Sequence, residues 1–165
     1  MEQIIKFAKV KDVKSPVRGT SASAGLDFFI PNDFEPHELL PGEDVLIPSG
    51  IKVCVPKGYM LMAANKSGVV TSKNACINCG RPAEKSPFTT SIIVGAAIID
   101  EDYQGEIHIH LINAGIEPAE IKPGMKIAQF ILVPVLYASP EEVSTAQLYS
   151  EKSERGEGGF GSTNP

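Results

Sequence analysis

Short apolar segments alternate with glycine and proline along almost the whole chain. The 15 glycines and 13 prolines interrupt nearly every stretch that could have formed a long helix, and the segments between them are rich in Val, Ile and Phe. The chain has no internal repeat. This pattern predicts an all-β fold of the sandwich, barrel or jelly-roll type, and 165 residues are enough for one domain with a sizeable core.

The clearest element is Gly95–Gly115, which the pattern predicts to be a single β-hairpin. The apolar run Ala96–Ile99 leads into an acidic turn at Asp100–Gly105, and a strictly alternating strand follows. Its apolar face carries Ile107, Ile109 and Leu111, and its polar face carries Glu106, His108 and His110. Such a hairpin would hold the carboxylates of the turn and the ring of Tyr103 rigidly at the edge of a pocket, although an ordinary acidic turn explains the same residues.

Further apolar runs predict the other strands of the fold. They are Gln3–Val10, Asp44–Ile47, Ile51–Val55, Tyr59–Ala64 and Met125–Val135, with a turn at Pro48–Gly50 between the second and the third. The last run is nearly continuously apolar, so the amide of Gln129 needs a hydrogen-bond partner unless it lies at a strand edge. Pro140–Tyr149 carries a weaker signal for a short helical turn.

The chain carries a formal net charge of −5 and has no block of basic residues. Binding of nucleic acid through a charged surface is therefore not expected, and any phosphate must be held by a few placed groups. No apolar run is long enough to cross a bilayer, and the first ten residues lack the pattern of a signal peptide. Three cysteines, an odd number, do not make a secreted disulfide framework. We expect a cytoplasmic protein with reduced thiols and no membrane partner.

Two short segments combine small residues with charged ones. In AGLDFF, Asp27 lies between residues that should be buried, where a carboxylate is costly unless it is paired or acts on a ligand. An Asp that caps a turn is the simpler alternative. In NKSG, the ammonium of Lys66, the hydroxyl of Ser67 and the backbone amide of Gly68 could together bind an anion, although many turns contain the same residues.

A polar stretch, Thr71–Ser91, interrupts the succession of strands, and we expect an insertion in the fold at residues 71–93. Its Cys76 and Cys79 resemble half of a zinc knuckle, but a tetrahedral site needs four ligands. The remaining candidate ligands are Cys54, His37, His108 and His110. A redox pair is a second alternative, and an adventitious pair in an exposed loop is the simplest interpretation.

The chain ends in a glycine-rich segment, residues 150–165, with a single aromatic side chain. This segment cannot bury enough apolar surface to fold by itself, so it is either a disordered tail or a mobile arm. Arg155, Phe160 and Ser162 are what an arm needs to close on a nucleotide, because Arg can bind a phosphate, Phe can stack on a base and a hydroxyl can donate to phosphate oxygens. We therefore expect a catalytic β domain at residues 1–149, followed by a flexible C-terminal arm.

Five segments of the chain resemble, in the same order, the five motifs of the homotrimeric dUTPase family (deoxyuridine 5′-triphosphate nucleotidohydrolases). The segments are AGLDFF, NKSG, GAAIIDEDYQGEIHIHLINAG, KPGMKIAQFILVPV and RGEGGFGST. The resemblance covers nearly the whole chain apart from the insertion. It implies a jelly-roll subunit, a homotrimer whose active sites are shared between subunits, and Mg²⁺ as the cofactor. The implied reaction is the hydrolysis of dUTP to dUMP and pyrophosphate, by attack of water at the α-phosphorus.

The resemblance also implies roles for residues around the base, the sugar and the attacking water. Asp100 would orient and deprotonate the water, and Tyr103 would pack on the deoxyribose and leave no room for a 2′-hydroxyl. The backbone from Val94 through Ile99, including Gly95 and Ala97, would read the edge of the uracil.

Other residues would hold the phosphates and the metal ion. Ser67 and Gly68, with Lys66 beside them, would bind the phosphates, and Gln129 would contact the substrate from the fourth motif. Asp27 would hydrogen-bond to waters on Mg²⁺ rather than bind the ion directly. The arm would place its residues over the bound substrate. These are Arg155 on the γ-phosphate and Phe160 over the uracil, with Gly161 and Ser162 also in contact.

The chain departs from the family pattern in two places. Lys66 stands where the family usually has Arg, and the two side chains bind phosphate with different geometry. The residues after Gly68 lack the usual helix-forming run, and an insertion at this place resembles those of some phage enzymes. The insertion suggests a phage origin, a location in the host cytoplasm and a second role in binding a regulatory protein.

Three other functions fit parts of the sequence. A dCTP deaminase shares the fold but needs a catalytic Glu on the strand after the turn, where this chain has His108 and His110, with Glu106 close to the turn. The same three residues could bind a metal in a cupin-like barrel, although a polar strand face at a subunit contact explains them more simply. The third alternative is a binding module whose insertion docks a partner, but the intact Asp100 and arm argue against lost catalysis.

Overall fold

The computed structural model describes residues 4–66, 92–95 and 98–158. Backbone contacts divide the chain into two units, Met1–Val135 and Leu136–Pro165. The predicted arm at residues 150–165 lies inside the second unit. The boundary between residues 149 and 150 stays a prediction.

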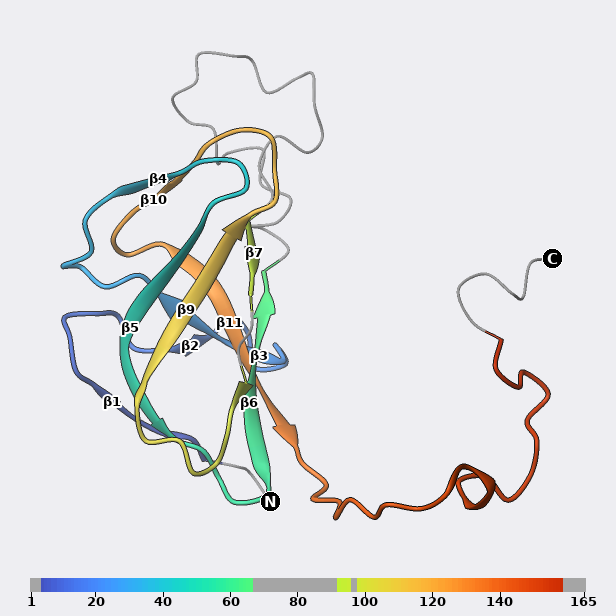
Figure 1. Cartoon of the computed structure of the whole chain (residues 1–165). Helices are drawn as coiled ribbons and strands as arrows, with labels where there is room; N and C mark the ends of the chain where they lie inside the picture. The colour runs from blue at the N-terminus through green and yellow to red at the C-terminus, as the bar shows by residue number, and fades with distance from the viewer. Residues whose placement is uncertain (1–3, 67–91, 96–97, 159–165) are drawn as a thin grey trace. The chain divides into compact units, whose positions relative to one another are not determined.

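Strands make up nearly all the regular structure of the described residues, as Figure 1 shows, and the predicted all-β fold is confirmed. One antiparallel sheet has the order β1-β5-β9-β7, a second has the order β2-β3-β11-β6-β8, and a small third sheet pairs β4 with β10. The strands are β1 (Lys6–Lys9), β2 (Val17–Arg18), β3 (Gly25–Phe29), β4 (His37–Leu39), β5 (Asp44–Cys54), β6 (Tyr59–Asn65), β7 (Ile92–Val94), β8 (Ile98–Ile99), β9 (Glu106–Asn113), β10 (Ala119–Ile121) and β11 (Lys126–Pro134).

The two larger sheets contribute to one hydrophobic core. The predicted alternation along β9 is confirmed, because Ile107, Ile109 and Leu111 are buried while His108 is exposed. The second sheet supplies Phe28 from β3 and Phe130 from β11, whose ring centroids are 4.5 Å apart. Such aromatic pairs stabilise a core beyond the area that they bury. The core therefore fixes which side chains of β3 and β11 point outward.

The predicted hairpin at Gly95–Gly115 is only partly confirmed. The acidic turn lies between β8 and β9, but β8 pairs with β6 of the second sheet, whereas β9 pairs with β5 and β7 of the first. The chain therefore changes sheets between Val94 and Ile98. Gly95 donates its N–H to the carbonyl of His110 at 2.9 Å, and a Cβ at residue 95 would lie 2.1 Å from Nδ1 of that histidine. Only glycine fits at this point of departure.

The predicted turn at Pro48–Gly50 is wrong, because β5 runs through it as one strand of 11 residues. The register with β9 shifts between Pro48 and Lys52, and Gly50 has a φ of +73°. Proline and a positive-φ glycine suit a bulge as well as a turn. Pairing on both sides, with β9 and with β1, keeps the strand continuous here.

The pair β4–β10 was not predicted, and the buried amide of Asn113 holds its surroundings in place. Its Nδ2 donates to the carbonyls of Leu39 at 2.8 Å and Glu117 at 2.9 Å, and its Oδ1 accepts from the N–H of Gly115 at 2.9 Å. A fully buried amide is tolerated because its donors and its acceptor are all satisfied.

The described part of the second unit has no buried residue, because every residue from Leu136 to Glu157 is exposed. Its one regular element is the 3₁₀ helix η1 (Thr145–Gln147), where Ser144 and Gln147 form a capping box. The predicted short helical turn within Pro140–Tyr149 is therefore confirmed.

The predicted insertion at residues 71–93 lies mostly outside the described residues, as do Cys76 and Cys79. Its last two residues, Ile92 and Ile93, belong to β7 and pair with β9. Among the described residues, no helix combines the length and the apolar character needed to cross a membrane.

Asn113→Ala should lower the free energy of unfolding by about 2–4 kcal/mol, because two carbonyls and one N–H would lose their partner in the interior. Urea unfolding measures the change. The exposed amide Gln104 provides the control, and Gln104→Ala should change the free energy of unfolding by less than about 0.5 kcal/mol. Equal, small effects of both substitutions would show that Asn113 does not hold this region.

Candidate active site

Three neighbouring strands of the second sheet bring together residues that are far apart in the sequence. Asp27 on β3 lies opposite Gln129 on β11, which in turn lies opposite Ala64 on β6. Lys66 follows the end of β6 and donates a hydrogen bond to Oδ1 of Asp27. Three of the predicted site residues, Asp27, Lys66 and Gln129, are therefore neighbours in the fold.

Asp27 is the charged centre of this cluster. Its side chain is almost fully buried, and its second oxygen, Oδ2, lies 3.0 Å from Nζ of Lys126. Burial by itself would raise the pKa of the Asp27 carboxyl, but hydrogen bonds and charges from Lys66 and Lys126 together hold that pKa below its ordinary value. Asp27 is therefore ionised at neutral pH, and the costly buried carboxylate predicted from the sequence is paired.

Lys126 is a member of the cluster that the sequence did not reveal. It lies opposite Phe29 at the start of β11, and only the register of β3 and β11 shows that its ammonium reaches Asp27. A lysine close before Gln129 in the fourth motif was the available signal. With one carboxylate and two ammonium groups, the cluster has an excess of one positive charge, which favours an anionic ligand.

Asn65 is a second residue that the sequence did not single out. Its carbonyl accepts a hydrogen bond from Nε2 of Gln129 at 2.8 Å, and its Oδ1 accepts from the N–H of Val94 at 2.6 Å. Gly25 leaves room for the Gln129 side chain, because a Cβ there would lie 2.6 Å from its Oε1. The amides of Val94 and Gly95, predicted to read a base, thus donate to Asn65 and to the carbonyl of His110 in this structure.

The acidic turn between β8 and β9 presents Asp100 and Tyr103. Asp100 is exposed directly after the buried Ile99, and its carbonyl accepts from the N–H of Tyr103 at 3.2 Å. The phenol of Tyr103 donates to the backbone oxygen of Glu106 at 2.9 Å. A Cβ at Gly105 would lie 2.3 Å from that phenol oxygen, so the ring lies over the glycine. The turn thus carries an anchored aromatic ring and an exposed carboxylate three residues apart in sequence.

These two groups of residues lie at opposite ends of β6. Leu61 of β6 pairs with Ile99, and Glu101 accepts a hydrogen bond from the N–H of Gly58, just before β6 begins. Lys66 follows the other end of the strand. A strand rises about 3.3 Å per residue, so Gly58 and Lys66 are on the order of 25 Å apart. Figure 1 shows β6 running the length of its sheet.

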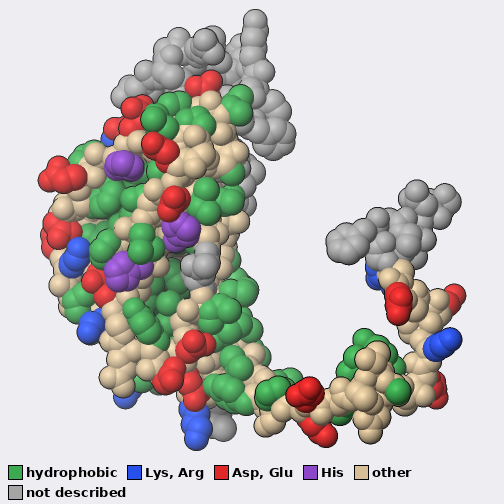
Figure 2. All heavy atoms as spheres, in the orientation of Figure 1, with side chains coloured by type: hydrophobic (Ala, Val, Ile, Leu, Met, Phe, Trp, Pro, Cys, Tyr) green, Lys and Arg blue, Asp and Glu red, His purple; other side chains and the backbone are tan. Residues whose placement is uncertain are grey.

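Among the described residues, the histidines form no metal site with other candidate ligands. Nε2 of His110 lies 2.9 Å from Oδ2 of Asp44, and Nδ1 of His108 lies 3.0 Å from the carbonyl of Glu106. In residues 4–66, 92–95 and 98–158, no three His, Cys, Asp or Glu side chains are placed to hold a metal ion. Figure 2 shows the imidazoles scattered among acidic side chains on one face. The cupin-like alternative is therefore not supported.

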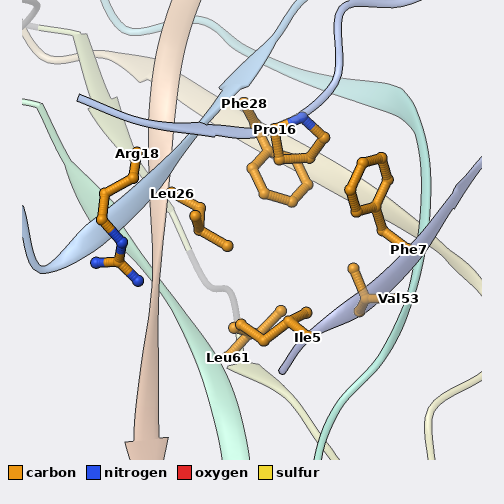
Figure 3. Close-up of a pocket in the computed structure, with 8 residues that line it drawn as sticks. All are labelled: Ile5, Phe7, Pro16, Arg18, Leu26, Phe28, Val53 and Leu61. Carbon is orange, nitrogen blue, oxygen red and sulfur yellow. The ribbon is translucent and has the colours of Figure 1, made fainter. Parts of the chain in front are cut away.

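A cavity of about 180 Å³ among the described residues contains none of the predicted site residues. Figure 3 shows its lining, which consists of Ile5, Phe7, Pro16, Arg18, Leu26, Phe28, Val53 and Leu61. Leu26 and Phe28 flank Asp27 in β3, and successive side chains of a strand point to opposite faces. The apolar cavity and the charged cluster thus lie on opposite faces of the second sheet.

Several predicted site residues lie outside the described residues. They are Ser67, Gly68, Ala97, Phe160, Gly161 and Ser162. Arg155 is described and exposed in the second unit, where its Nε donates to the carbonyl of Gly158 at 2.7 Å.

Comparison with known proteins agrees with the five-motif pattern. A model of the dUTPase family matches residues 84–164. The deoxyuridine 5′-triphosphate nucleotidohydrolase of Mus musculus is 33% identical over 160 residues, which cover 96% of this chain and 84% of the mouse protein.

Solved structures show the same fold. The dUTPase of Staphylococcus bacteriophage 80alpha, with dUPNHPP, superposes with a TM-score of 0.76 at 22% identity, over 99% of this chain and 100% of the phage protein. A mutant dUTPase from phage phi11 of S. aureus, in which a structural Mg(II) ion is coordinated, gives a TM-score of 0.67 at 20% identity, over 86% and 97% of the two chains. Given its identity with the mouse enzyme over most of both chains, this chain belongs to the dUTPase family.

Proposed function

We propose that this protein hydrolyses dUTP to dUMP and pyrophosphate in the cytoplasm, as a homotrimer. The observation that carries the proposal is the turn after β8, which holds an exposed Asp100 and the anchored ring of Tyr103 in a chain of the dUTPase family. The family match supports dUTP as the substrate, and the geometry is consistent with the roles proposed for the residues.

In this proposal, the cluster around Asp27 binds the phosphates. Its two ammonium groups, on Lys66 and Lys126, carry one positive charge more than the carboxylate can neutralise. Both stay in place without substrate because Asp27 holds them, so little side-chain order must be created on binding. The predicted contacts from Ser67 and Gly68 would come from the residues that directly follow Lys66, and Gln129 lies on the same face.

Catalysis at the α-phosphorus requires a water molecule in line with the departing pyrophosphate. Asp100 is suited to orient this water and accept its proton, because it is exposed at the tip of a turn whose backbone is held on both sides. Such a general base typically contributes about 10²–10⁴-fold to the rate. The arm would close this site, with Arg155 on the γ-phosphate and Phe160 over the uracil.

The residues fit a Mg²⁺ ion that is held by substrate oxygens and waters. Asp27 uses one acceptor position on each oxygen for a lysine, and a carboxylate offers about four, so it can still accept from a metal-bound water. The described residues offer no cage of protein ligands. When bound, Mg²⁺ would neutralise charge that develops on the pyrophosphate.

The distance along β6 supports the proposal that active sites are shared between copies of this chain. The α-phosphorus must lie within a few ångströms of both the general base and the phosphate-binding groups, yet Asp100 and Lys66 lie at opposite ends of the strand. One chain therefore cannot supply both to the same dUTP, whereas neighbouring subunits of a cyclic trimer can. A regulatory partner at the insertion stays a prediction, because residues 71–91 lie outside the described residues.

Asp100→Asn should keep affinity for dUTP and reduce kcat by about 10²–10⁴-fold, because the amide cannot accept the proton. Pyrophosphate release measures turnover, with dTTP, dCTP and UTP as competing substrates, and with and without Mg²⁺. Asp102→Asn is the matched control, since Asp102 is an exposed acid of the same turn. If Asp102→Asn loses turnover and Asp100→Asn does not, the base is misassigned. Ammonia release from dCTP would instead indicate a deaminase.

Mixing two inactive variants should restore activity if sites are shared between subunits. Asp100→Asn lacks the base and Gln129→Ala lacks a group of the phosphate half, so a mixed trimer contains some sites with both groups intact. The variants are unfolded together, refolded together and assayed for pyrophosphate release, with each variant refolded alone as the control. No gain in activity on mixing would place both groups of a site in one chain.

Removing residues from Arg155 onward should lower kcat/KM for dUTP by at least about tenfold, because closure excludes water and adds a cation at the γ-phosphate. The trimer should persist, since the first unit holds the whole described core. Sedimentation and pyrophosphate release measure the two properties. A chain that ends at Thr163 keeps the fifth motif and serves as the control. An unchanged kcat/KM would show that these residues do not contribute to catalysis.

A further inference from the structure

Two glycines, Gly50 and Gly58, bracket the last part of β5, and both have a positive φ, +73° and +80°. Each donates its backbone N–H to a carboxylate near the acidic turn. The N–H of Gly50 donates to Oε1 of Glu106 at 2.6 Å, and the N–H of Gly58 donates to Oε2 of Glu101. Hydrogen bonds to a carboxylate are stronger than those to a neutral acceptor, and both side chains are half-buried.

The contact between Gly58 and Glu101 holds the residue next to the proposed general base. Glu101 follows Asp100 directly, and its contact with Gly58 ties the start of the turn to the beginning of β6. Gly58 is itself fixed, because its carbonyl accepts from the N–H of Val135 at 2.9 Å. The carboxylates of the turn therefore differ: Glu101 is hydrogen-bonded within the fold, whereas Asp100 and Asp102 are exposed.

The contact between Gly50 and Glu106 holds the residue that orients Tyr103. The ladder between β5 and β9 is interrupted between Pro48 and Lys52, and the carboxylate of Glu106 takes the N–H of Gly50 inside this interruption. The carbonyl of the same Glu106 accepts the phenol of Tyr103. A continuous chain of contacts therefore runs from the bulge in β5 to the aromatic ring.

We propose that Glu101 and Glu106 are positioning residues with separate tasks: Glu101 places Asp100 against the attacking water, and Glu106 places the Tyr103 ring against the sugar. The proposal rests on the proposed dUTP hydrolysis. Loss of the first anchor should act on the rate of the chemical step, because a displacement of about 1 Å can cost about 10²-fold in rate. Loss of the Glu106 anchor should act on the choice between deoxyribose and ribose.

Four single variants test the proposal: Glu101→Ala, Glu101→Gln, Glu106→Ala and Glu106→Gln. The glutamine variants keep an acceptor oxygen for the glycine N–H and remove the charge. Glu101→Ala should lower kcat for dUTP about 10- to 100-fold with KM and the preference for dUTP over UTP unchanged. Glu106→Ala should lower that preference at least about tenfold and change kcat less. Both glutamine variants should stay close to wild type.

The opposite patterns separate positioning from general damage to the fold. A purely structural role would lower the melting temperature and change kcat and sugar preference together in both alanine variants, which would overturn the proposal. Glutamine variants as impaired as the alanine variants would also overturn it, because the charge rather than the anchor would then be the cause.

A measurement without substrate separates this proposal from dUTP hydrolysis itself. Amide hydrogen exchange should become faster at Gly58 and in residues 100–103 of Glu101→Ala, and faster at Gly50 of Glu106→Ala, because each N–H loses its acceptor. Unchanged protection would refute the anchors even in an active enzyme. An unmodified protein that releases no pyrophosphate from dUTP would refute the proposed function, and the exchange data would then still show whether the anchors exist.

Discussion

The length of β6 is the constraint on which the organisation of this protein depends. A hydrogen-bonded strand cannot shorten, and its two ends carry different chemistry: the acidic turn with Asp100 at the first, and Lys66 with its partners at the second. Under the proposed function, the two ends of β6 belong to different active sites. Catalysis would then require association of copies of this chain, as in the proposed homotrimer.

The local part of the fold could be predicted from the sequence, and the non-local part could not. Tyr59–Ala64 and Met125–Val135 were predicted as short apolar runs, and β9 was predicted because strict alternation identifies a half-buried strand from a few residues. The sheet joined by β8 was not predicted, since an apolar pair carries no information on its partner. Pro48–Gly50 was misjudged because a bulge uses the same residues as a turn.

In the candidate site, too, local contacts could be predicted from the sequence and non-local contacts could not. Asp100 and Tyr103 lie in one contiguous motif, so their proximity could be predicted from the order of residues. Lys126 could not be placed beside Asp27, because their contact depends on how β3 and β11 align. This alignment allows a chain with a net charge of −5 to concentrate positive charge locally. The proposed binding of a triphosphate would then use these two lysines rather than the field of the whole protein.

The crossing at Gly95 has a consequence for how this sequence can change. The imidazole of His110 is held by Asp44 and occupies the space that any side chain at residue 95 would need. A substitution at residue 95 therefore requires the imidazole of His110 to shift or residue 110 to become smaller. The effect of either mutation depends on the other, which is epistasis of a purely steric kind. A library that varies the two positions one at a time would miss the combinations that fold.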